Sequence, residues 1–351
     1  MVALAITRLP EIVDTLPPGM AELFARFYSW YSETGHLVIP DEMQNWVHEK
    51  YGRIETQQVV RVTNTLTGES TLYNSLRAKR PIMTPRTEDA ADLLKTPPEG
   101  PFADPLRETP ADTFGRIDGE YWITASNIAK YDYLHGLIIS KAQDLFVTDE
   151  AAVLDLFNVA IRWCQEANRE YPRAVYPFLI WNVLWRAGAS VIHNHAQVLL
   201  THQPYRSPGW MARVREEYRK TYGSEYYDDL FTVHTELGLG ETFGTARVMA
   251  HLTPKKEQEV LVLGRTPHDL APALSRVLLC YQRMGILSFN MAAYMPQLEE
   301  EDYYCVRLVN RGDITVRTSD IGGMEFYAGT PVVSADPYRL MEHLAAVLAG
   351  G

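Results

Sequence analysis

The sequence predicts an α+β fold made of two related halves, each an antiparallel sheet packed with helices. The main observation is an order of hairpin, strand, strand, helix, strand, strand in residues 56–205, which partly repeats in residues 206–351. A length of 351 residues corresponds to about two domains. The 46% of hydrophobic and 22% of charged residues are typical of a globular protein and exclude a disordered or collagen-like chain.

Residues 1–55 are predicted to be an N-terminal helical extension. The run PPGMAELFARFYSWYSETG begins with prolines suited to a first helical turn and ends at a glycine. The following segment, QQVVRVTNTLTGESTLYNS, alternates like the two strands of a hairpin, with TNTLTG as the turn. Residues 84–115 are rich in Pro, Asp and Glu and are predicted to form a long surface loop.

The first half, residues 56–205, continues with two strand patterns, EYWITAS and HGLIISK. TDEAAVLDLFNVAIRWCQEAN has apolar residues at helical spacing, which predicts an amphipathic helix. AVYPFLIWNVLW is almost continuously apolar, as a strand buried on both faces would be, and VIHNHAQVLL alternates like a strand. In the second half, residues 206–351, helices are predicted for SPGWMARVREEYRKTYG and PHDLAPALSRVLLCYQRMG, and strands for TARVMAHL, EQEVLVLGR, SFNMAAYM and DYYCVRLVN.

The charge and the cysteines narrow the possible partners. The chain has 33 Lys and Arg against 44 Asp and Glu, a net charge of −11, which repels a phosphate backbone and argues against nucleic acid as a partner. Its three cysteines form no CxxC pair, so neither a disulfide framework nor a cysteine zinc site is predicted. Reduced cysteines, with no recognisable signal peptide or membrane span, predict a cytoplasmic protein with no membrane partner.

The feature most indicative of chemistry is a His-x-His-x-Gln run. His193, His195 and Gln197 alternate, so on a strand they share one face, where three polar side chains in an apolar strand are costly unless they bind something. The preceding turn with Gly188 and Ser190 can offer backbone N–H groups to an anion. A bare His pair on a solvent-facing strand and a metal site are the alternative interpretations.

With its neighbours, this run resembles the motif of the histidine-triad superfamily, in particular the branch of galactose-1-phosphate uridylyltransferase, ADP-glucose phosphorylase and diadenosine tetraphosphate phosphorylase. That motif has an Asn eleven residues before the first His, as Asn182 is before His193. The resemblance implies two histidine-triad-like halves and makes His195 the nucleophile that attacks the α-phosphorus of a nucleotide. It also implies that Gln197, Asn182 and Ser190 bind the phosphate.

A second segment is similar to the N-terminal motif of the uridylyltransferase. The chain reads NTLTGESTL, then four residues, then RAKRP, where the family has N-x-L-T-G-x-x-x-L and R-A-K-R-P. The resemblance places Arg77 and Arg80 at the nucleotide phosphates, a role that suits the planar, always charged guanidinium. The alternative is a solvated basic turn.

Two weaker similarities add candidate binding residues. Asn127 matches a position near the ribose, although a plain loop Asn is equally compatible with the pattern. Glu325, in a Gly-Gly-x-Glu segment, would bind sugar hydroxyls or form a turn. His135 is interpreted as structural.

The chain departs from the zinc-containing relatives. Where they have C-x-x-C, it has Gly100-Pro101-Phe102-Ala103, and where a second His-x-His is expected, it has Asp302-Tyr303-Tyr304-Cys305-Val306-Arg307, with no histidine. His193 cannot hold a structural zinc ion alone, so no metal and no other cofactor are predicted, and His193 is expected to orient the site through hydrogen bonds.

The resemblance implies a nucleotidylyltransferase that moves a nucleoside monophosphate between phosphate-bearing substrates through a covalent nucleotidyl-histidine. The partners would be a small nucleotide and a phosphorylated acceptor, with Arg77, Lys79, Arg80 and Arg186 forming a small basic site within an acidic shell. A Gln at position 197, where hydrolytic members carry a third His, favours transfer or phosphorolysis over hydrolysis. A histidine-triad hydrolase and a non-catalytic nucleotide-binding protein remain alternatives, and the relatives suggest a homodimer.

Overall fold

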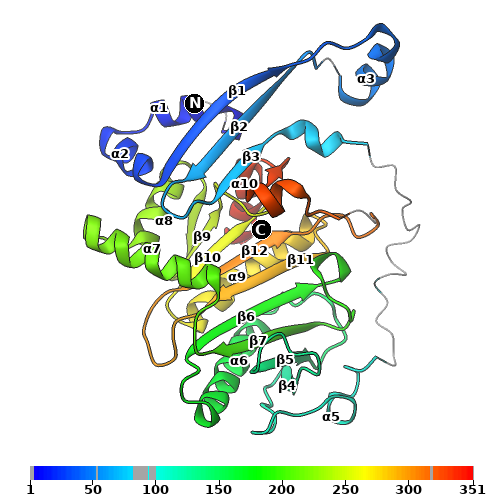
Figure 1. Cartoon of the computed structure of the whole chain (residues 1–351), viewed down its shortest axis with the longest axis vertical. Coiled ribbons are helices and arrows are strands. Elements are labelled where there is room, and N and C mark those ends of the chain that lie inside the picture. The colour runs from blue at the N-terminus through cyan, green and yellow to red at the C-terminus, as the bar shows by residue number, and fades with distance from the viewer. Residues whose placement is uncertain (1–3, 53, 82–93, 95–99, 317–318, 351) are drawn as a thin grey trace.

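The computed structural model describes residues 4–52, 54–81, 94, 100–316 and 319–350, which form a nine-stranded antiparallel sheet and a smaller four-stranded one (Figure 1). The large sheet has the order β4-β5-β7-β6-β11-β12-β10-β9-β8. Within the predicted surface loop of residues 84–115, residues 84–93 and 95–99 lie outside the described residues.

The first half of the large sheet consists of four strands and one helix, all close to their predicted positions. These elements are β4 (Trp122–Ser126), β5 (His135–Ser140), α6 (Glu150–Glu170), β6 (Tyr176–Val183) and β7 (His195–Thr201). The Asp149 side chain caps α6, because its Oδ1 accepts the Ala152 N–H at 3.0 Å.

The second half repeats this arrangement. Its elements are β9 (Ala246–Ala250), β10 (Val260–Gly264), α9 (Pro267–Arg283), β11 (Phe289–Tyr294) and β12 (Tyr304–Asn310). The strand order β4-β5-β7-β6 in one half corresponds to β9-β10-β12-β11 in the other, and β6 pairs with β11 where the halves meet. The predicted internal repeat is therefore visible in the topology, and β12 is the counterpart of β7.

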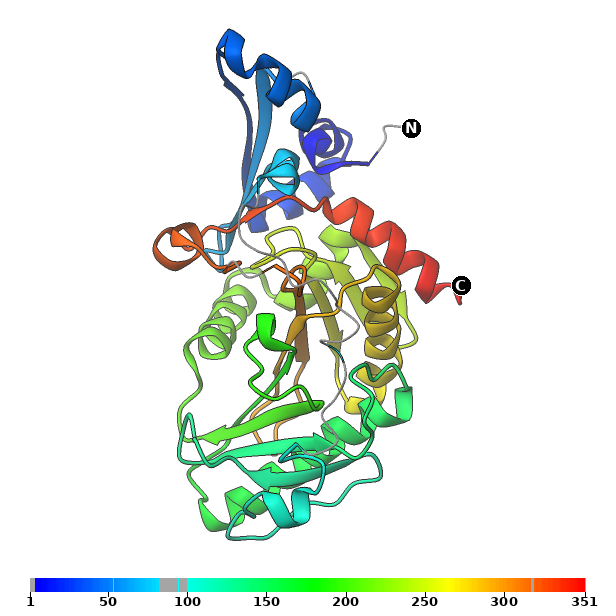
Figure 2. The ribbon, with the colours of Figure 1, turned by 90° about the vertical axis from the view of Figure 1, so that its right-hand side faces the viewer.

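The N-terminal segment differs from the predicted helical extension, because residues 28–36 form a strand. Short helices do form at α1 (Leu9–Asp14), α2 (Pro18–Phe27) and α3 (Gln44–Tyr51), but β1 (Tyr28–His36) pairs along its whole length with β2 (Thr56–Asn64). The aromatic run at the start of β1 favours an extended chain, and long-range pairing overrides the helical reading. The hairpin of β2 and β3 (Ser70–Tyr73) is confirmed, and β13 (Val332–Val333) adds to β3 in parallel. The β1–β2 arm stands off the main body with α3 at its tip (Figure 2).

The remaining elements were only partly anticipated. The predicted helix after residue 205 is α7 (Arg206–Tyr222). Not anticipated are α5 (Pro105–Glu108), α8 (Tyr226–Glu236), β8 (Gly240–Phe243), α10 (Pro337–Leu348) and the short turns η1 (Ile6–Arg8), η2 (Asp41–Met43), η3 (Ser75–Lys79), η4 (Trp185–Ala187) and η5 (Met324–Ala328). None of the helices in the described ranges is long and apolar enough to cross a bilayer.

The large sheet has a helix-covered face and an open face. Gly136 lies against the Trp163 ring of α6 and is directly across from Val198, so Val198 faces the helices. Residues that alternate with these, on β5 and β7, face the other way. Burial along β6 alternates, which corrects the expectation of a strand buried on both faces, because its second face is part of this open side.

Candidate active site

His195 and Gln197 lie on the open face of β7, next to the middle of the sheet. Both are buried, and their backbones pair with β5 at Ile139 and Leu137. On the other side Gln197 is directly across from Ile180 of β6. The alternation of β7 therefore places the two side chains on one face, as predicted.

The hydrogen bonds of His195 determine which ring nitrogen is available for chemistry. Its Nδ1 lies 2.7 Å from the His193 carbonyl oxygen, which can only accept, so Nδ1 carries the proton and donates. Nε2 then keeps its lone pair. Burial lowers the pKa of His195 below the ordinary value of 6.5, so the imidazole is neutral at pH 7.

His193 precedes β7 and is held by a backbone contact and an aromatic one. Its Nε2 donates to the Ser140 carbonyl oxygen at 2.8 Å. The Phe102 ring packs edge-on against His195, with ring centroids 4.9 Å apart, and against His193 at 6.2 Å. The segment of residues 100–103 thus brings an apolar ring to the histidines.

This arrangement does not fit a zinc site at the two histidines. In the part of the chain that is described, no group of three His, Cys, Asp or Glu residues lies close enough together to hold a metal ion. Phe102 offers no donor atom, and the His193 Nε2 is engaged with a carbonyl oxygen. That the protein works without zinc stays a prediction.

Gln197 is in contact with His135, which sequence reasoning treated as structural. The His135 Nε2 lies 2.9 Å from the Gln197 Oε1, and the amide nitrogen of Asn127 lies 3.3 Å from the same Nε2. Asn127, proposed to bind the ribose, is therefore beside the histidine strand. The signal that could have revealed His135 is its place at the start of a strand that is otherwise apolar.

The predicted phosphate-binding turn connects β6 and β7 and is strained. Leu184 has φ 65° and ψ 170°, a region that residues with a Cβ avoid at a cost of about 1–3 kcal/mol. Gly188 follows in the left-handed region with φ 91°, and Ser190 is exposed. Asn290 of β11 donates to the Ala187 carbonyl oxygen at 2.8 Å, so the second half helps to hold this turn.

Asn182 lies beside His195 on the open face and is engaged by the second half. Its Oδ1 accepts from the Asn290 Nδ2 at 2.6 Å, and the Asn290 Oδ1 in turn accepts from Arg311. Arg186 reaches from the turn to the carbonyl oxygens of Arg311 and Val316, at 2.9 and 2.7 Å. Asn290 and Arg311 were missed because nothing in their sequence context marks them as neighbours of Asn182.

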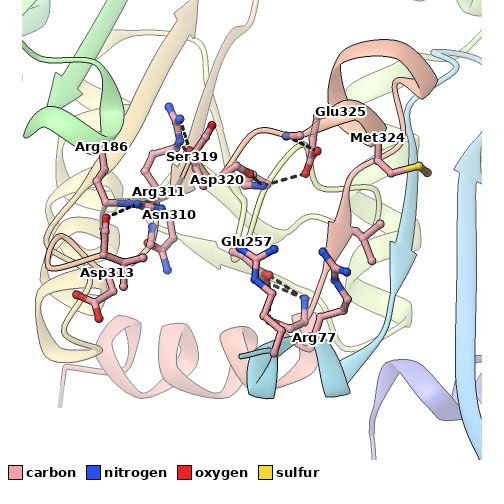
Figure 3. Close-up of a pocket in the computed structure, with 18 residues that line it drawn as sticks. Arg77, Arg186, Glu257, Asn310, Arg311, Asp313, Ser319, Asp320, Met324 and Glu325 are labelled. Atoms are coloured by element: carbon pink, nitrogen blue, oxygen red, sulfur yellow. Dashed lines mark hydrogen bonds and ion pairs between the residues drawn. The ribbon is translucent and has the colours of Figure 1, made fainter. Parts of the chain in front are cut away.

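The other predicted binding residues, Arg77, Arg80 and Glu325, line a separate cavity of about 360 Å³ (Figure 3). Arg77 enters it from η3 and Arg186 from η4. Neither the Arg77 nor the Arg80 guanidinium makes a hydrogen bond or an ion pair with a described residue. None of the residues that line this cavity lies on β7.

Glu325 is held in that cavity by two contacts. Its Oε1 lies 3.0 Å from the Lys256 Nζ, and its Oε2 accepts the Gly322 N–H at 2.9 Å. Burial alone would raise the pKa of Glu325, but these contacts lower it below its ordinary value. The predicted site residues thus fall into a histidine group and an arginine cavity. The two are joined by Arg186 and by the hydrogen bonds that link Asn182, Asn290 and Arg311.

Comparisons with known proteins agree with this architecture. No family model and no curated protein sequence matches the chain. Among solved structures, an ADP-glucose phosphorylase from Arabidopsis thaliana with bound ADP-glucose has a TM-score of 0.58 at 14% identity, covering 80% of this chain and 95% of that one. A uridylyltransferase has a TM-score of 0.58 at 13% identity, covering 83% of this chain and 98% of that one. A GALT-like protein from Arabidopsis thaliana has a TM-score of 0.53 at 13% identity, covering 67% and 91%. The chain therefore has the fold of the ADP-glucose phosphorylase and uridylyltransferase structures.

Proposed function

We propose that this protein is a nucleotidylyltransferase that moves a nucleoside monophosphate between two phosphate-bearing substrates through a covalent bond to His195. The observation that carries this proposal is the hydrogen bond from His195 Nδ1 to the His193 carbonyl oxygen at 2.7 Å. It leaves the Nε2 of a neutral imidazole with its lone pair, which is the state a nucleophile needs.

In the first step, the His195 Nε2 attacks the α-phosphorus of the donor. A P–N bond forms, the bond from phosphorus to the bridging oxygen breaks, and the leaving phosphate or sugar phosphate takes the electron pair. The imidazole keeps its Nδ1 proton and becomes positively charged, and the His193 carbonyl dipole stabilises that charge. In the second step, a phosphate oxygen of the acceptor attacks the phosphorus and the electron pair returns to Nε2.

Charge on the transferring phosphoryl group has to be met by donors already in place. Gln197 and the turn at Gly188 and Ser190 are assigned this role, with Asn182 beside them. The Gly188 N–H itself donates to the Trp185 carbonyl oxygen at 3.0 Å, so the donor of the turn is assigned to Ser190. Arg77 and Arg80, whose guanidinium groups have no described partner, are assigned to the phosphates of the substrates.

The substrates are proposed to be small nucleotides, with no nucleic acid, cofactor or metal required. Asn127 is assigned to the ribose and Glu325 to hydroxyl groups of a sugar. An amide at position 197 cannot act as a general acid or base, which favours transfer to phosphate over hydrolysis. The cytoplasmic location and the homodimer inferred from the sequence remain predictions.

Intact-mass analysis under non-acidic conditions tests the proposal. The protein is incubated in turn with UDP-glucose, ADP-glucose and diadenosine tetraphosphate, and its mass is compared with that of His195→Ala. The expected result is a nucleoside-monophosphate adduct on the wild type and none on the variant, and its mass would identify the base. No adduct and no turnover with any of these donors would overturn the proposal, and turnover without an adduct would favour a direct hydrolase.

A further inference from the structure

His135 is a buried imidazole whose two nitrogens have assignable roles. Its Nδ1 lies 2.9 Å from the backbone nitrogen of Tyr131. A backbone N–H can only donate, so Nδ1 is the acceptor, and the proton of the neutral ring is on Nε2. Burial lowers the pKa of His135 below 6.5, in agreement with a neutral ring.

This tautomer determines how the Gln197 amide is turned. Because His135 Nε2 carries the proton, it donates to the Gln197 Oε1 at 2.9 Å. The amide NH₂ then points away from His135. In the part of the chain that is described, the Gln197 Nε2 has no hydrogen-bond partner, and it is not sealed from solvent. The free donor is therefore at the open face beside His195.

The loop before β5 holds the His135 ring in place. The Tyr131 ring packs on it with centroids 4.5 Å apart, and the Lys130 Nζ donates to the His135 carbonyl oxygen at 3.0 Å. The Asn127 backbone N–H donates to the same carbonyl oxygen at 3.1 Å. A ring fixed in this way keeps its Nε2 proton aimed at one point.

We propose that His135 is a positioning residue, which holds the Gln197 amide with its NH₂ group toward the phosphoryl group on His195. The proposal rests on the proposed function. An amide turned by 180° would lose the His135 hydrogen bond and present its oxygen to the negative phosphoryl oxygens. His135 therefore selects the orientation that stabilises the transferring group, without touching it.

A double-mutant cycle with His135→Phe and Gln197→Ala tests this role. The readout is the single-turnover rate of adduct formation with whichever of UDP-glucose, ADP-glucose or diadenosine tetraphosphate labels the wild type. Removing one positioned donor costs roughly 10²-fold or more in rate. We expect each single variant to lose about 10²-fold and the double variant to lose no more than either, because both act through one hydrogen bond. Losses that multiply to about 10⁴-fold would overturn the proposal.

Two further variants separate positioning from folding. His135→Gln keeps a side-chain donor for the Gln197 Oε1 and is expected to recover most of the rate lost in His135→Phe. His234→Phe removes another fully buried imidazole, far from the site in sequence, and is expected to change stability but not the single-turnover rate. An equal loss of rate in His234→Phe and His135→Phe, in step with stability, would contradict positioning.

A measurement on the wild type does not depend on any variant folding. In ¹⁵N spectra of histidine side chains, His135 is expected to be the neutral Nε2–H tautomer at pH 7, and an Nδ1–H tautomer or a charged ring would overturn the proposal. A wild type with this tautomer but no adduct would mean that the proposed function has failed, and the positioning role with it. If the wild type forms an adduct but the losses of rate in the two single variants multiply in the double variant, only the positioning role has failed.

Discussion

Each half of the large sheet has a polar pair at the same relative positions on neighbouring strands, but the two pairs differ in charge and in how fully they are hydrogen-bonded. In the first half, Gln197 is directly across from Leu137, and its partner His135 lies two residues earlier in the chain. In the second half, Arg307 is directly across from Leu261, and its partner Glu259 also lies two residues earlier. The contacts measure 2.9 and 2.6 Å.

The first pair is neutral and leaves the NH₂ group of Gln197 without a described partner, whereas the second is charged and its groups are all paired. Arg307 also binds Glu69 of the hairpin at 2.6 Å, so its charge is met by two carboxylates. Two charges buried with their partners form a structural link, whereas a half-used amide is ready for a ligand. The same backbone geometry thus leaves an amide donor unpaired in one half and joins two paired charges in the other.

The largest difference in activity is expected between a variant that removes the proposed nucleophile, His195, and one that removes the residue at the matching position of the second half. His195 and Cys305 occupy matching positions, directly across from Ile139 and Leu263. His195→Ala is expected to lower turnover by at least about 10³-fold, because the covalent step is lost. Cys305→Ala removes a buried thiol with no role in transfer and should stay within about twofold of wild type. Steady-state kinetics with the labelling donor measures both, and a comparable loss in Cys305→Ala would show that the halves are not divided in this way.

The free energy of unfolding should be lowered more by a substitution in the second half than by one in the first. Arg307→Met leaves Glu259 and Glu69 without their main partner and is expected to cost about 3–5 kcal/mol of unfolding free energy. Gln197→Met leaves only the His135 N–H unpaired, at a cost of about 1–3 kcal/mol. Chemical denaturation gives both values. A Gln197→Met variant less stable than Arg307→Met would break the comparison.

The two halves should also respond to acid at different pH. The pKa of His195 is lowered by burial, so the nucleophile stays neutral down to 6.5, and adduct formation should fall as the pH drops below that value through its folded pKa. Burial alone would raise the pKa of Glu69, but Arg307 holds it well below 4.5. Its contribution to stability is therefore present above 4.5 and lost only as the pH falls from 4.5 through the folded pKa. Rates and circular dichroism over the same pH series should reveal a range in which the protein is folded but inactive, and coincident losses would contradict this prediction.

The smallest expected effect concerns the turns between the last two strands of each half. Gly188, before β7, has φ 91°, and Glu299, before β12, has φ 69°. Gly188→Ala should cost about 1–2 kcal/mol because a Cβ is disfavoured there. Glu299→Gly removes the same strain and should leave stability unchanged or raise it by up to about 1 kcal/mol. Denaturation midpoints compare the two, and a neutral Gly188→Ala would show that the turn does not need its left-handed residue.

Local patterns were sufficient for most elements of the two halves but not for the contacts between them. The spacing of apolar residues predicted α6, α9 and the strands beside them, because each of these elements depends on its own local sequence. β1 was predicted as helix, since its strand character depends on pairing with β2, some 30 residues later. The histidine strand and its turn were recognisable from spacing. The role of His135 and the location of Arg77 in a separate cavity depend on strand register and on chain segments far apart, which spacing does not encode.

The pairing of β6 with β11 has a consequence for how such a chain can be divided. The two strands are joined from Val183 and Phe289 to Phe178 and Tyr294, so the halves share one continuous ladder rather than a hinge. A fragment ending after β7 would carry β6 as a bare edge, with unpaired N–H and C=O groups ready to bind another strand. An antiparallel edge can pair with its own copy about a two-fold axis. Half of this chain would therefore be expected to occur as a dimer of itself, with the present protein corresponding to that dimer joined into one polypeptide.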